Sequence, residues 1–193
     1  KYIQEYHAFA AEHEHLIAKT LFAAGTTWPG VFSHEDRRSV DYLLTRKEVD
    51  SERIGCGGLS GGGLRTIFLA GLDPRIRCAD CVGFMSTFRE LLRNNIKCHT
   101  WMLYLPHLPR YLDLPDLIAL MAPNPLMVQY DTEDDLYTLD GQRAADRKIS
   151  MIYGKMGRAS CYSGRFYPGP HKFDIQMQED AFRWFERWLM GKG

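Results

Sequence analysis

One short stretch constrains the fold of this chain more than any other, the glycine-rich turn at residues 55–63. Residues 58–62 fit the pattern G-x-S-x-G, with Ser60 at its centre. The run before this pattern is apolar and strand-like, and residues 64–70 after it are helix-like. A serine between a strand and a helix sits in a strained turn, where glycine neighbours avoid collisions. The pattern therefore predicts that Ser60 is a nucleophile, with helix N–H groups facing any oxyanion that forms beside it.

The composition limits the class of protein. The chain has 193 residues, of which 45% are hydrophobic and 12% aromatic, enough for the core of one domain. Lys and Arg number 24 and balance 24 Asp and Glu, so a nucleic-acid partner is not indicated. We find no run long enough for a membrane helix and no signal peptide. The first residue is Lys1 and not Met, which suggests trimming, processing or a fragment.

The five cysteines are an odd number without the spacing of a disulfide framework. Cys78 and Cys81 form a C-x-x-C pattern, but it opens a strand and has no second pair that would complete a zinc site. We therefore expect no metal and no cofactor. Buried free thiols behave as small hydrophobic side chains, and unpaired cysteines favour a reducing compartment such as the cytoplasm.

Apolar periodicity predicts short buried strands that alternate with helices. The expected strands cover residues 53–59, 76–85, 126–130 and 160–167. The expected helices cover residues 5–24, 35–45, 64–70, 87–94, 113–121, 139–153 and 175–190, and residues 26–33 are expected to be a loop. This alternation is typical of an α/β fold with a parallel sheet. Residues 99–112 lack clean periodicity, and we interpret residues 99–121 as a lid or substrate-pocket insertion.

A serine hydroxyl needs a base to take its proton, and the base needs an acid to orient it. In domains with this turn, the acid and then the histidine follow the serine along the chain. Four acids follow the third predicted strand. We favour Asp134, with Asp135 next and with Glu133 and Asp131 behind them.

His171 is the favoured base, because it lies between the fourth predicted strand and the last helix. His34 and His99 are weaker candidates. His107 could instead contact substrate, with Trp101 and Tyr104 lining an apolar or sugar-stacking pocket.

The residue after the nucleophile, Gly61, would supply one backbone N–H to an oxyanion hole. The second donor normally comes from a loop after an early strand. Before Arg53 the sequence offers helices and loops but no buried strand that could carry such a loop.

In their order along the chain, these blocks resemble the α/β-hydrolase superfamily, in particular its acetyl xylan esterase and dienelactone hydrolase-like branch. The resemblance runs from about Gly25 to the C-terminus. Its blocks are residues 41–43, 49–55, the serine turn, 72–76, 122–126, the acidic loop and 169–173. It implies an α/β-hydrolase fold, a parallel sheet flanked by helices. It also implies a triad in which Ser60 is the nucleophile, His171 the base and Asp134 the acid.

The sequence departs from the family pattern in two ways. Where the pattern reads G-x-x-D-P-L, this chain has Asp131 in place of Gly and Asp135 in place of Pro, which leaves the choice between Asp134 and Asp135 open. The early strands and the oxyanion loop of the family are also missing. We therefore expect residues 1–193 to be a single, N-terminally incomplete domain that needs its missing part or a partner chain.

The leading functional hypothesis is a serine hydrolase that cleaves carboxylic esters of small molecules or carbohydrates, with acetyl esters of sugars as one option. The first alternative is a serine peptidase of the prolyl-oligopeptidase kind, which shares the serine turn. The second is a non-catalytic binding protein with a hydrolase fold, which the missing oxyanion strand would explain.

Overall fold

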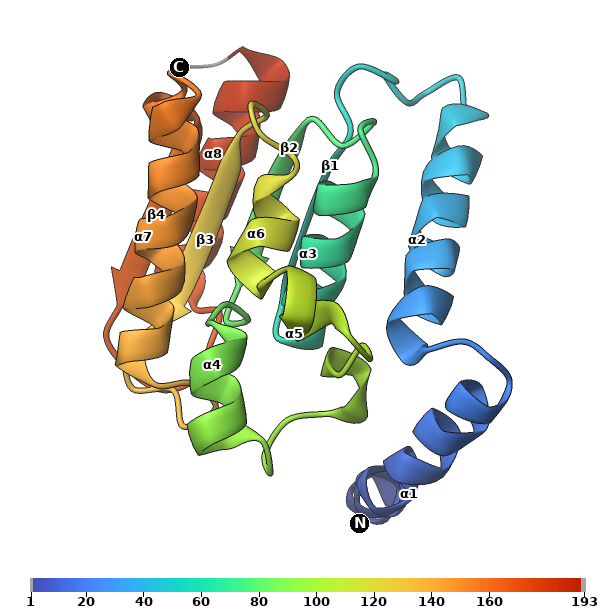
Figure 1. The fold of residues 1–193 in the computed structure, drawn as a ribbon. Helices are drawn as coiled ribbons and strands as arrows, with labels where there is room; N and C mark the ends of the chain where they lie inside the picture. Colours follow the sequence, from blue (N-terminus) through green and yellow to red (C-terminus); the bar gives the residue numbers. More distant parts are fainter. Residues whose placement is uncertain (1, 192–193) are drawn as a thin grey trace.

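The computed structural model describes residues 2–191, and its centre is a four-stranded, fully parallel sheet in the order β1-β2-β3-β4. The strands are β1 (Gly55–Leu59), β2 (Cys78–Val82), β3 (Leu126–Asp131) and β4 (Tyr162–Tyr167). Because the strands are parallel, their carboxyl ends meet at one edge of the sheet, the lower edge in Figure 1. The predicted α/β fold with a parallel sheet is confirmed.

Helices cover both faces of the sheet. In Figure 1, α3, α6 and α7 lie on one face and α8 lies on the other, while α2 packs beside α3 and α1 extends away from the sheet. The long helices are α1 (Tyr2–Ala23), α2 (Trp28–Leu44), α3 (Gly61–Leu72), α7 (Leu139–Lys155) and α8 (Ile175–Met190). The short helices are α4 (Phe88–Glu90), α5 (Leu108–Tyr111) and α6 (Leu114–Ala119), with single turns η1 (Leu91–Asn95), η2 (Trp101–Leu103) and η3 (Ala159–Cys161).

The two middle strands hold the core, because every residue of β2 and β3 is buried. Alternate side chains point to opposite faces of the sheet, so each strand serves two clusters. Val128 packs in the large cluster under α3, α6 and α7, whereas its neighbour Met127 packs with Trp184 of α8. This two-sided burial explains why the strands appear in the sequence as continuous apolar runs.

The expected start of α2 and the expected end of α7 are wrong. Residues 26–33 are not a loop, since α2 already begins at Trp28. Thr27 caps this helix through its hydroxyl, which accepts from Gly30 N, and Pro29 in the first turn is compatible with a helix start. At the other boundary α7 continues through Gly154 and ends at Lys155.

The last helix has the bounds that the sequence predicts, and its apolar residues are not all on the buried face. Phe182 is 65% exposed, while the buried face of α8 is formed by Met177, Ala181 and Trp184. The amphipathic pattern identified the helix but did not fix which apolar residues face the sheet.

Strand β1 lies at an edge of the sheet, because it pairs only with β2 and no residue from 2 to 54 forms a strand. Next to it lies a groove of about 500 Å³ whose apolar wall comes from α8. The groove is lined by Asp50, Arg53, Phe182, Phe185, Glu186, Leu189 and Met190. Helix α1 also exposes large apolar side chains, including Tyr6 and Phe9. Within residues 2–191, no helix is both long and apolar enough to cross a membrane.

Candidate active site

Ser60 occupies the strained turn that the sequence predicts. It follows the last residue of β1 and precedes α3, with φ 57° and ψ −118°, a backbone conformation that residues other than glycine rarely adopt. Its backbone N–H donates to Val82 O at 2.9 Å, which ties the turn to the end of β2. The Ser60 side chain makes no cap hydrogen bond to α3, so its hydroxyl is not used to start the helix.

The glycines around Ser60 have unequal roles. A Cβ at Gly58 would lie 2.8 Å from the backbone of Gly62, and a Cβ at Gly63 would lie 2.8 Å from Val82 O. A Cβ at Gly62 would meet no atom within 4 Å. The expected collision therefore exists at Gly58 but not at Gly62, and Gly63 is the second position where a side chain would collide with backbone.

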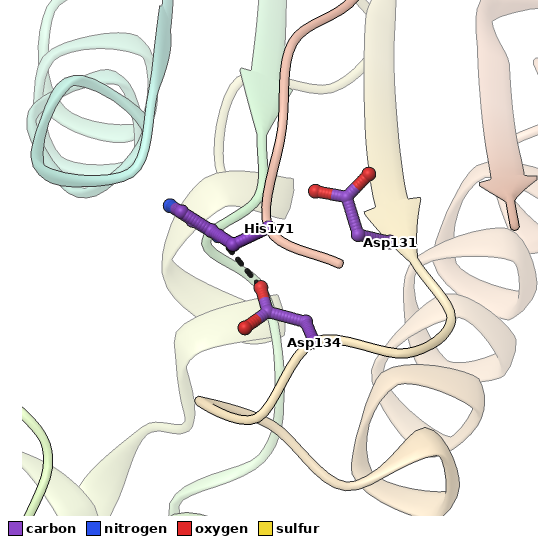
Figure 2. Close-up of side chains that lie close together, drawn as sticks. All are labelled: Asp131, Asp134 and His171. Carbon is purple, nitrogen blue, oxygen red and sulfur yellow. Dashed lines mark hydrogen bonds and ion pairs between the residues drawn. The ribbon is translucent and has the colours of Figure 1, made fainter. Parts of the chain in front are cut away.

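The third strand and the last loop bring an acid and a histidine together. Asp134 Oδ2 lies 2.7 Å from His171 Nδ1, as Figure 2 shows. The other carboxylate oxygen of Asp134 accepts from Leu136 N at 2.9 Å, so both oxygens are engaged. The Asp134 side chain is only 1% exposed, whereas Asp135 and Glu133 are exposed. Of the four acids in this loop, Asp134 is thus the one bonded to His171.

Gly83 links the histidine to the serine turn, and the sequence analysis missed it. It directly follows β2 with φ +57°, and a Cβ there would lie 3.0 Å from His171 Cε1 and 3.2 Å from Leu59 Cδ1. The end of β2 therefore lies between the end of β1 and His171. The expected strand to residue 85 is wrong, since β2 ends at Val82. A glycine that interrupts an apolar run was the signal that could have revealed this position.

The nitrogen of His171 that faces away from Asp134 is free. His171 Nε2 is buried and has no hydrogen-bond partner within residues 2–191, so the structure contains no hydrogen bond from Ser60 Oγ to this atom. Catalytic hydrogen bonds are often long in free enzymes and shorten when substrate binds. The bond between Asp134 and His171 is therefore formed, and no hydrogen bond joins Ser60 to His171 in the described residues.

The two expected oxyanion donors differ in what the structure offers for them. Gly61 is the first residue of α3, where backbone N–H groups have no partner inside the helix. The second donor has no counterpart in the part of the chain that the structure describes, because only helices and turns precede β1.

The weaker substrate-binding candidates separate into two groups. Trp101 and Tyr104 line a cavity of about 300 Å³ together with Ile96, Lys97 and His99, whereas His107 is exposed outside it with φ 67° at the start of α5. The ring of His99 packs edge-on against Phe84, two residues from Val82. The half-buried ring of His99 and the buried ring of Phe84 thus connect this cavity to the end of β2.

His99 lines this cavity, and a hydrogen bond to the backbone fixes its ring. Its Nε2 donates to Leu136 O at 2.8 Å, and burial lowers the pKa of its imidazole. His99 therefore contacts the loop after β3 through a backbone carbonyl and the Tyr137 ring, and no hydrogen bond joins it to a carboxylate in the described residues, as a catalytic base would require.

One group in the described residues has metal-ligand spacing. The ligand atoms of Asp131, Asp134 and His171 lie within 4.8 Å of one another. Two of these atoms, His171 Nδ1 and Asp134 Oδ2, are hydrogen-bonded to each other. This is the arrangement of an acid–histidine pair. Cys78 and Cys81 cannot cooperate, because they pack in clusters on opposite faces of the sheet. Burial raises the pKa of both thiols, which keeps them protonated.

Comparisons with known proteins give one sequence relative and many similar structures. No protein-family model matches the chain. It is 26% identical over 174 residues to "Putative hydrolase YtaP" of Bacillus subtilis (strain 168), which covers 90% of this chain and 58% of that protein. The chain therefore spans less than two thirds of this curated relative.

Two solved esterase structures illustrate the structural similarity. A carbohydrate esterase family 15 glucuronoyl esterase from Caldicellulosiruptor kristjansonii matches with a TM-score of 0.68 and 17% identity, over 83% of this chain and 50% of that chain. A "putative acetyl xylan esterase" from Bacteroides fragilis NCTC 9343 matches with a TM-score of 0.67 and 19% identity, over 80% of this chain and 40% of that chain. At these identities the similarity establishes the fold. This chain therefore has the α/β-hydrolase fold, as its resemblance to that superfamily predicts.

Proposed function

We propose that this chain is the catalytic part of a serine hydrolase that cleaves carboxylic esters of carbohydrates. The observation that carries the proposal is the 2.7 Å contact between His171 and Asp134, at the sheet edge where the strained Ser60 also lies. A buried acid bonded to a histidine beside a serine turn is the arrangement that activates a serine hydroxyl.

The chemistry follows from the roles of these side chains. Ser60 Oγ attacks the acyl carbon while His171 Nε2 takes the hydroxyl proton. Asp134 holds the Nδ1 proton and stabilises the imidazolium that forms. The Gly61 N–H donates to the oxyanion of the tetrahedral intermediate. The intermediate expels the alcohol, which receives the proton from His171. Water then repeats the sequence on the acyl-enzyme, releasing the carboxylic acid and free Ser60.

The substrate class rests on the cavity beside the site and on similar proteins. Trp101 and Tyr104 offer aromatic faces of the kind that stack on sugar rings, and the exposed Lys97, which also lines the cavity, adds a positive charge. The solved structures of the same fold are described as esterases of carbohydrates. Acetyl esters and uronic acid esters are both compatible with such a cavity. Measuring the rate of hydrolysis of one ester of each kind separates these two substrate classes.

The incomplete oxyanion hole belongs to the same proposal. Ile54 O accepts from Arg77 N and Ser60 N donates to Val82 O, so the even-numbered residues of this segment face β2. Because successive residues of a strand face opposite neighbours, the backbone groups of Gly55 and Gly57 face the free edge of β1. An exposed strand edge beside an apolar groove favours pairing with another strand. We expect a strand from outside these 193 residues, or from a second chain, to cover this edge and bring the second oxyanion donor.

Labelling with a fluorophosphonate probe, followed by peptide mass analysis, tests the proposal. We expect a single adduct on Ser60 and ester hydrolysis that Ser60→Ala lowers at least about 1,000-fold. Ser39→Ala is the matched control, because Ser39 is exposed on α2 and should leave labelling unchanged. Full hydrolysis by Ser60→Ala would contradict the proposal.

If the folded chain takes no label, the probe is repeated on the protein purified from its natural source, at the length and in the assembly in which it occurs there. Labelling restored there supports an oxyanion donor from outside these residues. If the natural protein also stays unlabelled, this favours a non-catalytic hydrolase-fold protein and overturns the esterase proposal.

A further inference from the structure

Two loops meet at the acid–histidine pair and are joined along their backbones. Thr132 N donates to Tyr167 O at 2.9 Å, and Glu133 N donates to Gly169 O at 3.0 Å. These two bonds fix the histidine loop only as far as residue 169. The peptide that carries His171 needs a further attachment, because its imidazole must stay aligned to within fractions of an ångström.

Asp131 supplies that attachment. Its Oδ2 accepts from Lys172 N at 3.1 Å, so it holds the peptide bond directly after His171. Asp131 is the last residue of β3 and is fully buried, and its own carbonyl accepts from Gln142 Nε2 of α7 at 2.8 Å. Figure 2 shows the Asp131 and Asp134 carboxylates approaching the His171 segment from two places, the strand end and the loop after it.

Burying a second carboxylate, that of Asp131, beside Asp134 is unfavourable for stability, which indicates that Asp131 has a role beyond packing. Asp131 Oδ1 is buried without a hydrogen-bond partner in the described residues. Burial raises the pKa of Asp131, the charge of Asp134 raises it further, and the Lys172 N–H together with the charges of His171 and Lys172 lowers it. A buried, incompletely paired carboxylate is unfavourable for folding, so an apolar residue would serve a purely structural purpose better.

From this geometry we propose that Asp131 is a positioning residue for the hydrolase site, which holds the backbone beside His171 so that the imidazole stays bonded to Asp134 with Nε2 directed toward the serine turn. This inference rests on the proposed function, and it assigns a role to the aspartate that stands where the resembling family has glycine.

The test compares three variants of Asp131. Asp131→Ala and Asp131→Leu remove the acceptor for Lys172 N, and leucine keeps the branching of aspartate at Cγ, so it provides a second apolar variant if the cavity left by alanine prevents folding. Asp131→Asn retains an oxygen acceptor. We expect kcat to fall about ten- to hundred-fold in the first two with KM within about twofold, and asparagine to recover most of kcat. Asp135→Ala is the control, since Asp135 is exposed in the same loop.

A second readout does not depend on hydrolysis. The downfield proton NMR signal of His171 Nδ1–H reports its bond to Asp134. It should broaden or vanish in Asp131→Leu and persist in Asp131→Asn and Asp135→Ala. A normal signal and normal kcat in Asp131→Leu would overturn the positioning role while leaving the esterase intact. If Ser60→Ala shows that hydrolysis does not use this site, the NMR comparison alone still decides whether Asp131 holds the imidazole.

Discussion

At the scale of single residues, Gly83 shows how the absence of a side chain makes room for His171 of the candidate site. The chain turns there with φ +57°, and the ring of His171 fills the space that a Cβ would take. Only glycine combines that backbone angle with so close an approach at little cost. The position is therefore constrained twice, by the turn after β2 and by the histidine.

We predict that Gly83→Ala lowers kcat by about tenfold or more, because the added methyl displaces His171, and destabilises the protein by about 1–2 kcal/mol through its positive φ. Steady-state kinetics and urea denaturation measure the two effects. Gly157→Ala is the matched control: Gly157 has φ +68° with no atom within 4 Å of an added Cβ. It should lose stability but keep kcat. Equal kcat in both variants would refute the contact argument.

At the scale of elements, α3 approaches the sheet closely at its first turn. Gly63 lies against Val82 O and Phe84 Cβ, both too close for a side chain, and backbone cannot easily yield. Farther along the same helix, a Cβ at Gly71 would collide with Leu117 O of α6. Glycines thus set how near α3 lies to β2 and to α6, and this spacing holds Ser60 at the strand end.

We predict that Gly63→Ala lowers the free energy of unfolding by about 1–3 kcal/mol, because the methyl forces α3 away from β2. Gly62→Ala, one residue earlier with open space, should cost nothing and can gain up to about 1 kcal/mol from helix propensity. Thermal or urea unfolding of both variants measures the difference. The prediction fails if the two substitutions change stability equally.

At the scale of the whole molecule, one face of the sheet carries a buried carboxyl group whose protonation links the stability of the fold to pH. On the face covered by α8, Asp80 is buried and accepts from Gln129 Nε2 at 2.9 Å, while its other oxygen has no partner in the described residues. Burial raises the pKa of Asp80 to about 7; the Gln129 hydrogen bond and the charge of Arg165 oppose this, and Asp180 adds to it. The carboxyl is therefore protonated in the folded protein at mildly acidic pH.

This shift makes stability depend on pH in a defined direction. An aspartate in the unfolded chain titrates near pH 3.9. Between that value and about pH 7 the folded state binds the extra proton, so the contribution of Asp80 to stability is greatest at low pH and falls as pH rises to about 7. We predict that Asp80→Asn removes this decline, which is on the order of a few kcal/mol.

Urea denaturation at several pH values between 4 and 8 measures the slope for the wild type and the variant. Asp135→Asn, which changes an exposed carboxylate, serves as the control and should keep the wild-type slope. An unchanged slope in Asp80→Asn would show that Asp80 titrates normally in the folded protein.

Much of the fold could be predicted from local patterns. Helix α8 was predicted with its exact bounds because an amphipathic repeat depends only on neighbours along the chain. The apolar runs of β2 and β3 predicted a buried parallel sheet, because strands covered on both faces need apolar residues at every position. The start of α2 was missed because Pro29 resembled a loop signal, although it is compatible with the first turn of a helix.

The sequence by itself determined the serine turn, the order of acid and histidine, and the small set of candidates for each, since these follow from residue types next to predicted strands. Only the tertiary structure decided which acid meets His171, because the path of the loop after β3 buries Asp134 and exposes Asp135. The same is true of Gly83 and Asp131. Their contacts join segments 88 and 41 residues apart, and local chain patterns carry no information about which distant backbone will lie against them.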